Sequence, residues 1–227
     1  MTALTEHQIL VKAVKQNLLN RGLETPMLDT YGLGTLYSHE SRHQTIIEAF
    51  TSIMQVLGLD LDDDSLAGTP NRMANMYLND IFSGLDYHNF PNCTTVENKM
   101  GYDQMIAVDA INLQSSCEHH LVVMDGYATI AYIPKKKILG LSKFNRIVQF
   151  FAKRPQIQER LTEQIAATIQ LICATDDVAV LIKATHFCVK ARGVHDQTSY
   201  TVTSKLSGVF LTKPECRAEF MSLANTK

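Results

Sequence analysis

Two stretches of the sequence carry residue types that bind metal ions. In Cys117-Glu118-His119-His120, the Cys-x-x-His spacing lets a tight turn place a thiolate and an imidazole on one zinc ion. The second stretch, Val178–Arg192, reads as a strand and carries Cys188 on the same face as His186. Two sulfurs and one imidazole leave tetrahedral zinc an open fourth position for water, which is the arrangement of a catalytic zinc.

The same residues also have ordinary interpretations. A Cys-x-x-His spacing arises by chance, and an isolated cysteine such as Cys188 is more often a small core residue than a ligand. His119 and His186 are equally consistent with hydrogen-bonded structural histidines. Nothing local in the sequence brings residues 117 and 188 together, so the metal site is a hypothesis at this level.

A second group of residues could bind phosphate. Ser142 stands at an expected helix start, and Lys143 and Arg146 follow on one helix face at i, i+3 spacing. A helix N-terminus with basic side chains suits an anion, although a solvated cationic face is an equally good interpretation. Three further cations could join the same ligand: Arg72, Lys190 and Arg192.

One carboxylate could recognise a base. Glu159 follows Gln158 early in an expected helix, and a carboxylate there can accept hydrogen bonds from the N1–H and 2-amino edge of guanine. Without further context, a surface glutamate paired with a nearby cation is the simpler interpretation.

The elements that position these residues change in character along the chain. Residues 1–100 are predicted to be mainly helical, with helices that end near Gly22 and Gly58 and a third that Thr69 caps before Pro70. Residues 101–227 are expected to form one compact α+β unit. Its expected strands are Met105–Leu113, Leu121–Met124, Tyr127–Ile133, Val178–Arg192 and Thr198–Leu206.

Three further features complete this expected unit. Asp125-Gly126 is a two-residue hairpin signal between two of the strands. One helix is expected from a Ser142 cap, and another from Pro155 to Cys173. Because Tyr127–Ile133 is apolar or small on both faces, the sheet is expected to be covered on both sides, by helices or by another subunit.

Composition excludes several classes of protein. The chain has 227 residues, and 21 Lys and Arg against 23 Asp and Glu give a net charge of −2, which argues against a nucleic-acid binder. No apolar run reaches the roughly 20 residues of a membrane span, and the N-terminus lacks a signal-peptide pattern. Five scattered cysteines indicate thiols or metal ligands and not a disulfide framework. We therefore expect a cytoplasmic protein.

Four longer motifs occur in one order and together resemble GTP cyclohydrolase I of the zinc-dependent, bacterial type. They are Ser115–His120, Gly140–Gln149, Arg154–Thr162 and His186–Gly193, with Thr69–Met73 as a further match. The resemblance implies the tunnelling fold, an antiparallel sheet with helices on one side. It also implies that five subunits form a ring. Two such rings stack into a homodecamer, with the active sites at subunit boundaries.

The resemblance also implies a reaction and a role for each candidate residue. GTP and water are converted to formate and 7,8-dihydroneopterin triphosphate. One zinc ion per subunit is held by Cys117, His120 and Cys188, while His119 and His186 transfer protons. The residues implied to bind GTP are Gln158 and Glu159 at the guanine, Ser142 near the ribose, and Arg72, Lys143, Arg146, Lys190 and Arg192 at the triphosphate.

Two other hypotheses compete with this one. Another pterin or deazapurine enzyme of the same fold would keep Glu159 and change the metal residues. A non-catalytic zinc scaffold would need a fourth protein ligand to close the metal site.

Overall fold

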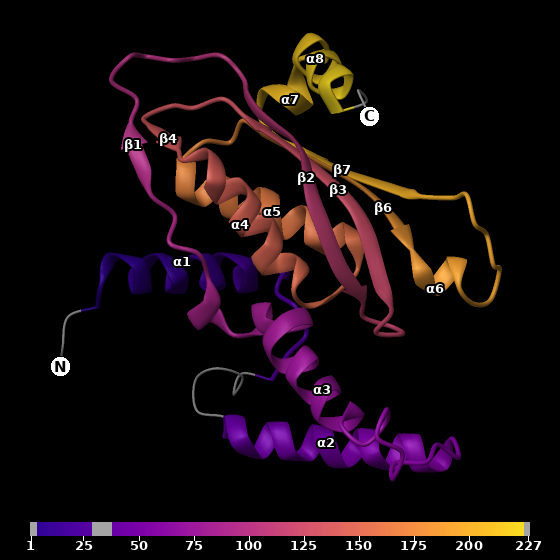
Figure 1. The fold of residues 1–227 in the computed structure, drawn as a ribbon. Helices are drawn as coiled ribbons and strands as arrows, with labels where there is room; N and C mark the ends of the chain where they lie inside the picture. The colour runs from indigo at the N-terminus through magenta and orange to yellow at the C-terminus, as the bar shows by residue number, and fades with distance from the viewer. Residues whose placement is uncertain (1–3, 29–37, 225–227) are drawn as a thin grey trace. The chain divides into compact units, whose positions relative to one another are not determined.

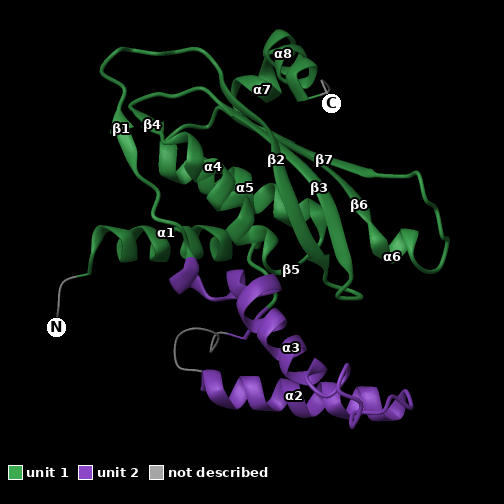
Figure 2. Cartoon of the chain, viewed as in Figure 1, with its two compact units in different colours: residues 1–26, 90–227 green, residues 27–89 purple. Residues whose placement is uncertain are grey.

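The computed structural model describes residues 4–28 and 38–224. The chain divides into two compact units, one of residues 27–89 and one of residues 1–26 and 90–227 (Figure 2). No helix of the described residues is both long enough and apolar enough to cross a membrane.

The unit of residues 27–89 is helical. Its elements are α2 (His39–Val56), α3 (Thr69–Asn75), the π-helix η1 (Met76–Ile81) and the 3₁₀ helices η2 (Ser83–Leu85) and η3 (Tyr87–Asn89). The predicted cap of α3 is wrong by one residue. Gly68 precedes the helix, so Thr69 is already helical and Pro70 lies in the first turn, where its missing N–H is tolerated.

The larger unit contains a five-stranded sheet with strand order β5-β2-β3-β6-β7, and a separate β1-β4 pair. The pairs are antiparallel except for β2 with β5. Its elements are α1 (Glu6–Asn20), β1 (Thr95–Glu97), β2 (Ile106–Cys117), β3 (Val123–Tyr132), β4 (Lys137–Leu139), α4 (Leu141–Ala152), β5 (Pro155–Gln156), α5 (Gln158–Cys173), β6 (Val178–His186), α6 (Phe187–Lys190), β7 (Thr201–Leu206), α7 (Val209–Thr212) and α8 (Pro214–Ala224).

Helices α4 and α5 lie along one face of the five-stranded sheet, and the short helices α7 and α8 pack at one end of the strands (Figure 1). On the α4 face, Phe144 of α4 packs against Tyr132 of β3, with ring centroids 5.6 Å apart. The neighbouring residue Ala131 points to the opposite face, where Phe210 of α7 and Phe220 of α8 pack against it. The α+β class is therefore confirmed, but the helices are not confined to one side of the sheet.

The predicted hairpin at Asp125-Gly126 is wrong, because both residues lie inside β3. The turn between β2 and β3 falls earlier, at residues 118–122. Glycine at 126 serves a close approach of two strands and not a turn. A Cβ atom there would collide with the carbonyl oxygen of Lys183 and lie 2.6 Å from the Cα of Ala184 in β6.

Three other predicted boundaries are corrected. The strand expected to run to Arg192 ends at His186. Its antiparallel partner β3 begins at Val123, and Met124 pairs with His186, so no strand of the described residues lies beside the residues that follow. Gly140 is the residue before α4, so Ser142 lies inside the helix and does not cap it. Pro155 belongs to the short strand β5, and α5 begins at Gln158.

Candidate metal centre

The turn after β2 presents the first two candidate ligands. Cys117 ends β2, and its backbone N–H donates to the carbonyl of Val122 at 2.8 Å while its carbonyl accepts from Leu121 at 2.8 Å. These two bonds close the turn on itself. Cys117 is buried and His120 is exposed, so the turn offers one sulfur from the interior and one imidazole from the surface.

The third candidate ligand comes from the end of β6. Because Met124 at the start of β3 pairs with His186, the residues after β6 lie beside the turn that precedes β3. Cys188 then sits in the short helix α6. The predicted strand alternation is therefore not what orients Cys188, and a change from strand to helix takes its place.

The structure brings these three side chains together. One ligand atom each of Cys117, His120 and Cys188 lies within 4.8 Å of the other two. The separation of Cys117 Sγ and His120 Nδ1 is 4.0 Å. Burial raises the pKa of the Cys188 thiol, and so does the neighbouring thiol of Cys117, whereas Arg192 lowers it. Two soft sulfur ligands and an imidazole fit zinc, and three protein ligands leave room for a fourth.

The two other candidate histidines flank this cluster. His119 is exposed, and its Nδ1 lies 3.8 Å from Cys117 Sγ. His186 is half-buried, and its Nε2 lies 2.8 Å from Oε1 of Gln158. Burial lowers the pKa of His186, and the nearby Glu159 carboxylate partly offsets this shift.

Gln158 is engaged with the protein itself. Its side chain is buried, and its amide nitrogen donates to the carbonyls of Ile182 and Thr201 at 3.0 and 3.1 Å and to Thr203 Oγ1 at 3.1 Å. The amide oxygen faces His186. Glu159, the next residue of α5, is exposed and so has its carboxylate at the surface.

An ion pair that sequence reasoning missed joins the turn to α5. Nη1 of Arg160 donates to Oε2 of Glu118 at 2.6 Å, and Nη2 donates to Oε1 at 3.3 Å. Glu118 stands between Cys117 and His119, so this bidentate pair links the candidate ligands to the first turn of α5. The two residues are 42 positions apart, and no local signal pairs them.

The candidate cations do not all gather at this centre. Arg192 does, since its Nη1 lies 2.7 Å from Nε2 of His120. Lys190 lies in α6, 5.6 Å from the ring centroid of Phe187. Arg72 belongs to the other unit, where its Nη2 donates to the Ser65 carbonyl at 3.1 Å and to Thr69 Oγ1 at 2.6 Å.

Three further candidates, Ser142, Lys143 and Arg146, lie at the opposite end of the sheet. They belong to the start of α4, where Phe144 packs on Tyr132. His186 pairs with Met124 at the other end of β3, and eight residues of strand (132 − 124) correspond to about 26 Å. One chain therefore does not bring these residues to the metal centre.

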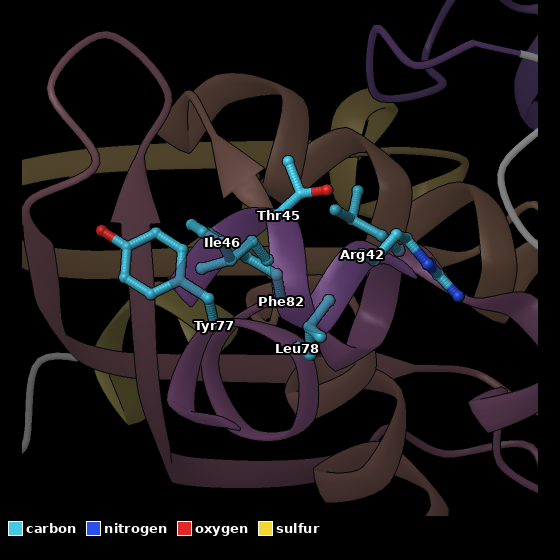
Figure 3. A pocket seen from close by; sticks show the side chains of 7 residues that line it. Arg42, Thr45, Ile46, Tyr77, Leu78 and Phe82 are labelled. Atoms are coloured by element: carbon cyan, nitrogen blue, oxygen red, sulfur yellow. The ribbon is translucent and has the colours of Figure 1, made fainter. Parts of the chain in front are cut away.

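A separate cavity of about 380 Å³ lies in the unit of residues 27–89 (Figure 3). Its lining is almost entirely apolar, and α2 and η1 supply most of it. The lining residues are Arg42, Thr45, Ile46, Tyr77, Leu78, Phe82 and Leu85. None of the predicted site residues is among them.

The fold and the site define an α+β protein with a Cys-His-Cys group, between a hairpin turn and a short helix, that could hold a metal ion. The model of the family "GTP cyclohydrolase I" matches residues 46–225. "GTP cyclohydrolase 1" of Shewanella sp. (strain W3-18-1) is 55% identical over 219 residues, which cover 96% of this chain and 99% of that protein. "GTP cyclohydrolase 1" of Aeromonas salmonicida (strain A449) is 55% identical over 221 residues, covering 97% and 98%. The chain belongs to the GTP cyclohydrolase I family, and the resemblance found in the sequence is confirmed.

Proposed function

We propose that this chain catalyses the hydrolytic opening of the guanine imidazole ring of GTP at C8, with release of formate and formation of 7,8-dihydroneopterin triphosphate. Family membership supports the substrate and the reaction class. The observation that carries the proposal is the convergence of Cys117, His120 and Cys188, which come from two stretches about 70 residues apart.

These three residues would hold one zinc ion per chain. Zinc, when bound, supplies Lewis-acid activation of water, which allows attack on C8 at neutral pH. The donor set supports zinc over a hard cation, because thiolates and imidazole suit a soft or borderline metal.

His119 and His186 would transfer protons as the ring opens and the product rearranges. Both lie next to the metal residues: His119 close to the Cys117 sulfur, and His186 at the end of β6. Gln158 holds His186 in place, because its other hydrogen bonds fasten the amide to β6 and β7. A fixed imidazole can meet the substrate atom without reorienting.

Glu159 would bind the guanine edge, since its exposed carboxylate can accept from N1–H and the 2-amino group. Gln158, the neighbouring residue in the first turn of α5, would belong to the same guanine-binding position. Apart from Arg72, all the proposed site residues lie in residues 101–227, which we propose as the catalytic region.

The triphosphate would be bound by residues of more than one chain. Arg192 and Lys190 lie at or near the metal centre, whereas Ser142, Lys143 and Arg146 lie at the far end of the sheet in the same chain. A second copy is therefore needed if both groups are to contact one GTP molecule. This need supports a ring of tunnelling-fold subunits, and we propose the homodecamer, with Arg72 as a further phosphate ligand.

The test combines metal analysis with product detection. In Cys117→Ser and Cys188→Ser, bound zinc and formate release are both expected to disappear. In His119→Ala, zinc is expected to stay bound while formate release and the fluorescence of the oxidised neopterin product disappear. If the wild-type protein binds zinc but releases no formate from GTP, it is a non-catalytic zinc scaffold and the proposed function is wrong.

A further inference from the structure

The segment that follows α1 is buried against the edge of the sheet. Gly22, with φ of +64°, ends the helix, and the N–H of Leu23 donates back to the carbonyl of Leu18 at 2.9 Å. The chain then turns inward. The Glu24 side chain is only 6% exposed and Thr25 is buried, although neither belongs to a helix or strand.

Glu24 forms an ion pair with a buried arginine. Oε1 of Glu24 lies 2.7 Å from Nη1 of Arg154, whose side chain is fully buried. The guanidinium carbon lies 4.6 Å from the ring centroid of Phe150 and 5.0 Å from that of Phe151. In such apolar surroundings the two charges attract each other strongly, so the pair tolerates little displacement.

Two buried amides make a second connection from the same segment. Nε2 of Gln164 donates to the carbonyl of Leu23 at 2.7 Å, and its Oε1 accepts from Nε2 of Gln156 at 2.7 Å. The Gln156 amide also donates to the carbonyl of Phe151 at 2.9 Å. We call Glu24, Arg154, Gln156 and Gln164 the buried brace.

The brace ends at the strand beside the metal turn. Strand β5 has two residues and follows Arg154 directly, and Gln156 pairs with Cys117. The carbonyl of Gln156 accepts from the N–H of Glu118 at 3.0 Å, and the carbonyl of Arg154 accepts from Ser115 Oγ at 3.3 Å. A two-residue edge strand has few ladder bonds of its own, so its position depends on what holds its other side.

We propose that Glu24 is a positioning residue for the metal centre: through the buried brace it holds β5, and β5 holds Cys117 and Glu118 in the arrangement that binds the ion. The inference rests on the proposed metal site. It assigns a role to the segment after α1, which carries no metal ligand and no proposed catalytic group.

The test compares variants of Glu24 with a control variant that is destabilised elsewhere in the fold. Glu24→Gln removes the charge of the carboxylate and keeps its shape. Phe220→Leu serves as the control, because it removes buried apolar contact in the α7–α8 cluster on the opposite face of the sheet. If Glu24→Gln does not fold, Glu24→Asp replaces it, because this variant keeps the charge and shortens the side chain by one methylene.

Zinc affinity is measured by chelator competition, and the geometry of the centre by the thiolate-to-metal absorption of the Co²⁺-substituted protein. Glu24→Gln is expected to bind zinc up to about 10-fold more weakly, the low end of the loss seen when a group bonded directly to a ligand is removed, because Glu24 acts on Cys117 only through Arg154 and β5. Its Co²⁺ absorption is expected to change as well. Saturating zinc is expected to restore kcat with the KM for GTP unchanged. Phe220→Leu, at equal loss of Tm, is expected to keep wild-type zinc affinity and absorption.

Two outcomes overturn the inference. One is a Glu24 variant with wild-type zinc affinity, and the other is an equal loss of affinity in Phe220→Leu, which would indicate general destabilisation. In both, the wild-type protein still binds zinc and releases formate, so the proposed function stands. A wild-type protein that binds no zinc overturns both proposals.

Discussion

At the scale of single residues, Gln158 connects the sheet to the proposed proton-transfer machinery. Replacing it with leucine leaves the carbonyls of Ile182 and Thr201 without their buried donor and removes the partner of His186. We expect Gln158→Leu to lower the free energy of unfolding by about 1–3 kcal/mol, the usual cost of unsatisfied buried polar groups. We also expect kcat to fall more than stability alone explains.

Thr203→Val is the matched comparison, because Thr203 bonds to Gln158 and Thr162 but not to His186. Urea unfolding and formate release are measured for both variants. Equal kcat values at equal stability would show that Gln158 has only a structural role.

Asp177 is a second residue with a defined effect, here on the pH dependence of stability. Burial raises the pKa of this carboxyl group, but the ion pair with Lys135 at 2.7 Å and the N–H of Val209 lower it by more, so the net shift is downward. The folded state thus binds this proton less readily than the unfolded state. The stabilisation is present above the ordinary pKa of about 4 and is lost as the pH falls through the lowered value.

We expect the wild-type free energy of unfolding to fall more steeply below pH 4 than that of Asp177→Asn. Urea titrations at a series of pH values measure this difference. Asp176→Asn changes an exposed neighbour and is expected to keep the wild-type slope. Parallel curves for the wild type and Asp177→Asn would contradict the prediction.

At the scale of elements, the approach of β3 to β6 limits what residue 126 can be. A methyl group there meets the backbone of Lys183 and the Cα of Ala184, which cannot move without breaking the ladder. We expect Gly126→Ala to lower the free energy of unfolding by about 1–3 kcal/mol, the range for overpacking. Asp125→Ala, at the exposed preceding residue, is the control, and equal urea midpoints for the two variants would contradict the prediction.

The same glycine shows how far the sequence can predict the elements. Periodicity predicts the helices around Val14 and Met54 because each helix follows its own apolar face. It cannot separate the two uses of glycine at Asp125-Gly126, since a turn and a close strand contact both require a missing side chain. It also extends β6 beyond His186, because a strand ends where its partner ends, and the partner is not visible in the local sequence.

The sequence likewise predicts only part of the candidate site. The residue types of Cys117, His120 and Cys188 predict a metal centre, but their proximity depends on the pairing of β3 with β6. The Glu118–Arg160 pair and the buried brace depend on contacts 42 and 130 residues apart. Local spacing contains no information on such contacts, because they depend on how distant parts of the chain pack.

At the scale of the whole molecule, a bound ion would link the turn that carries Cys117 and His120 to the helix that carries Cys188. Removing zinc with a chelator is expected to lower Tm, because a ligand present at 100 times its Kd stabilises the folded state by about 2.7 kcal/mol. Calorimetry with and without chelator measures the shift. Cys188→Ser is expected to show no chelator effect, and an equal shift in that variant would place the stabilising ion elsewhere.

Assembly is the second property of the whole molecule that can be tested. If one GTP contacts Glu159 of one copy and Lys143 of another, Glu159→Ala and Lys143→Ala proteins are each inactive. When they are dissociated, mixed and reassembled, about a quarter of the sites regain both residues if subunits mix at random. Formate release measures the recovery. Mixed assemblies without activity would mean that each chain supplies its own complete site.

The separation of the ligands along the chain also has a consequence for biosynthesis. The ribosome makes Cys117 and His120 long before Cys188, and the 71 residues from 117 to 188 take between about 4 and 14 s to translate. During that interval the nascent polypeptide carries a thiol and an imidazole but lacks the second sulfur. If these residues hold zinc as proposed, the ion would gain its third ligand only after Cys188 has left the ribosome, and a chain truncated before residue 188 would lack one of the two sulfurs.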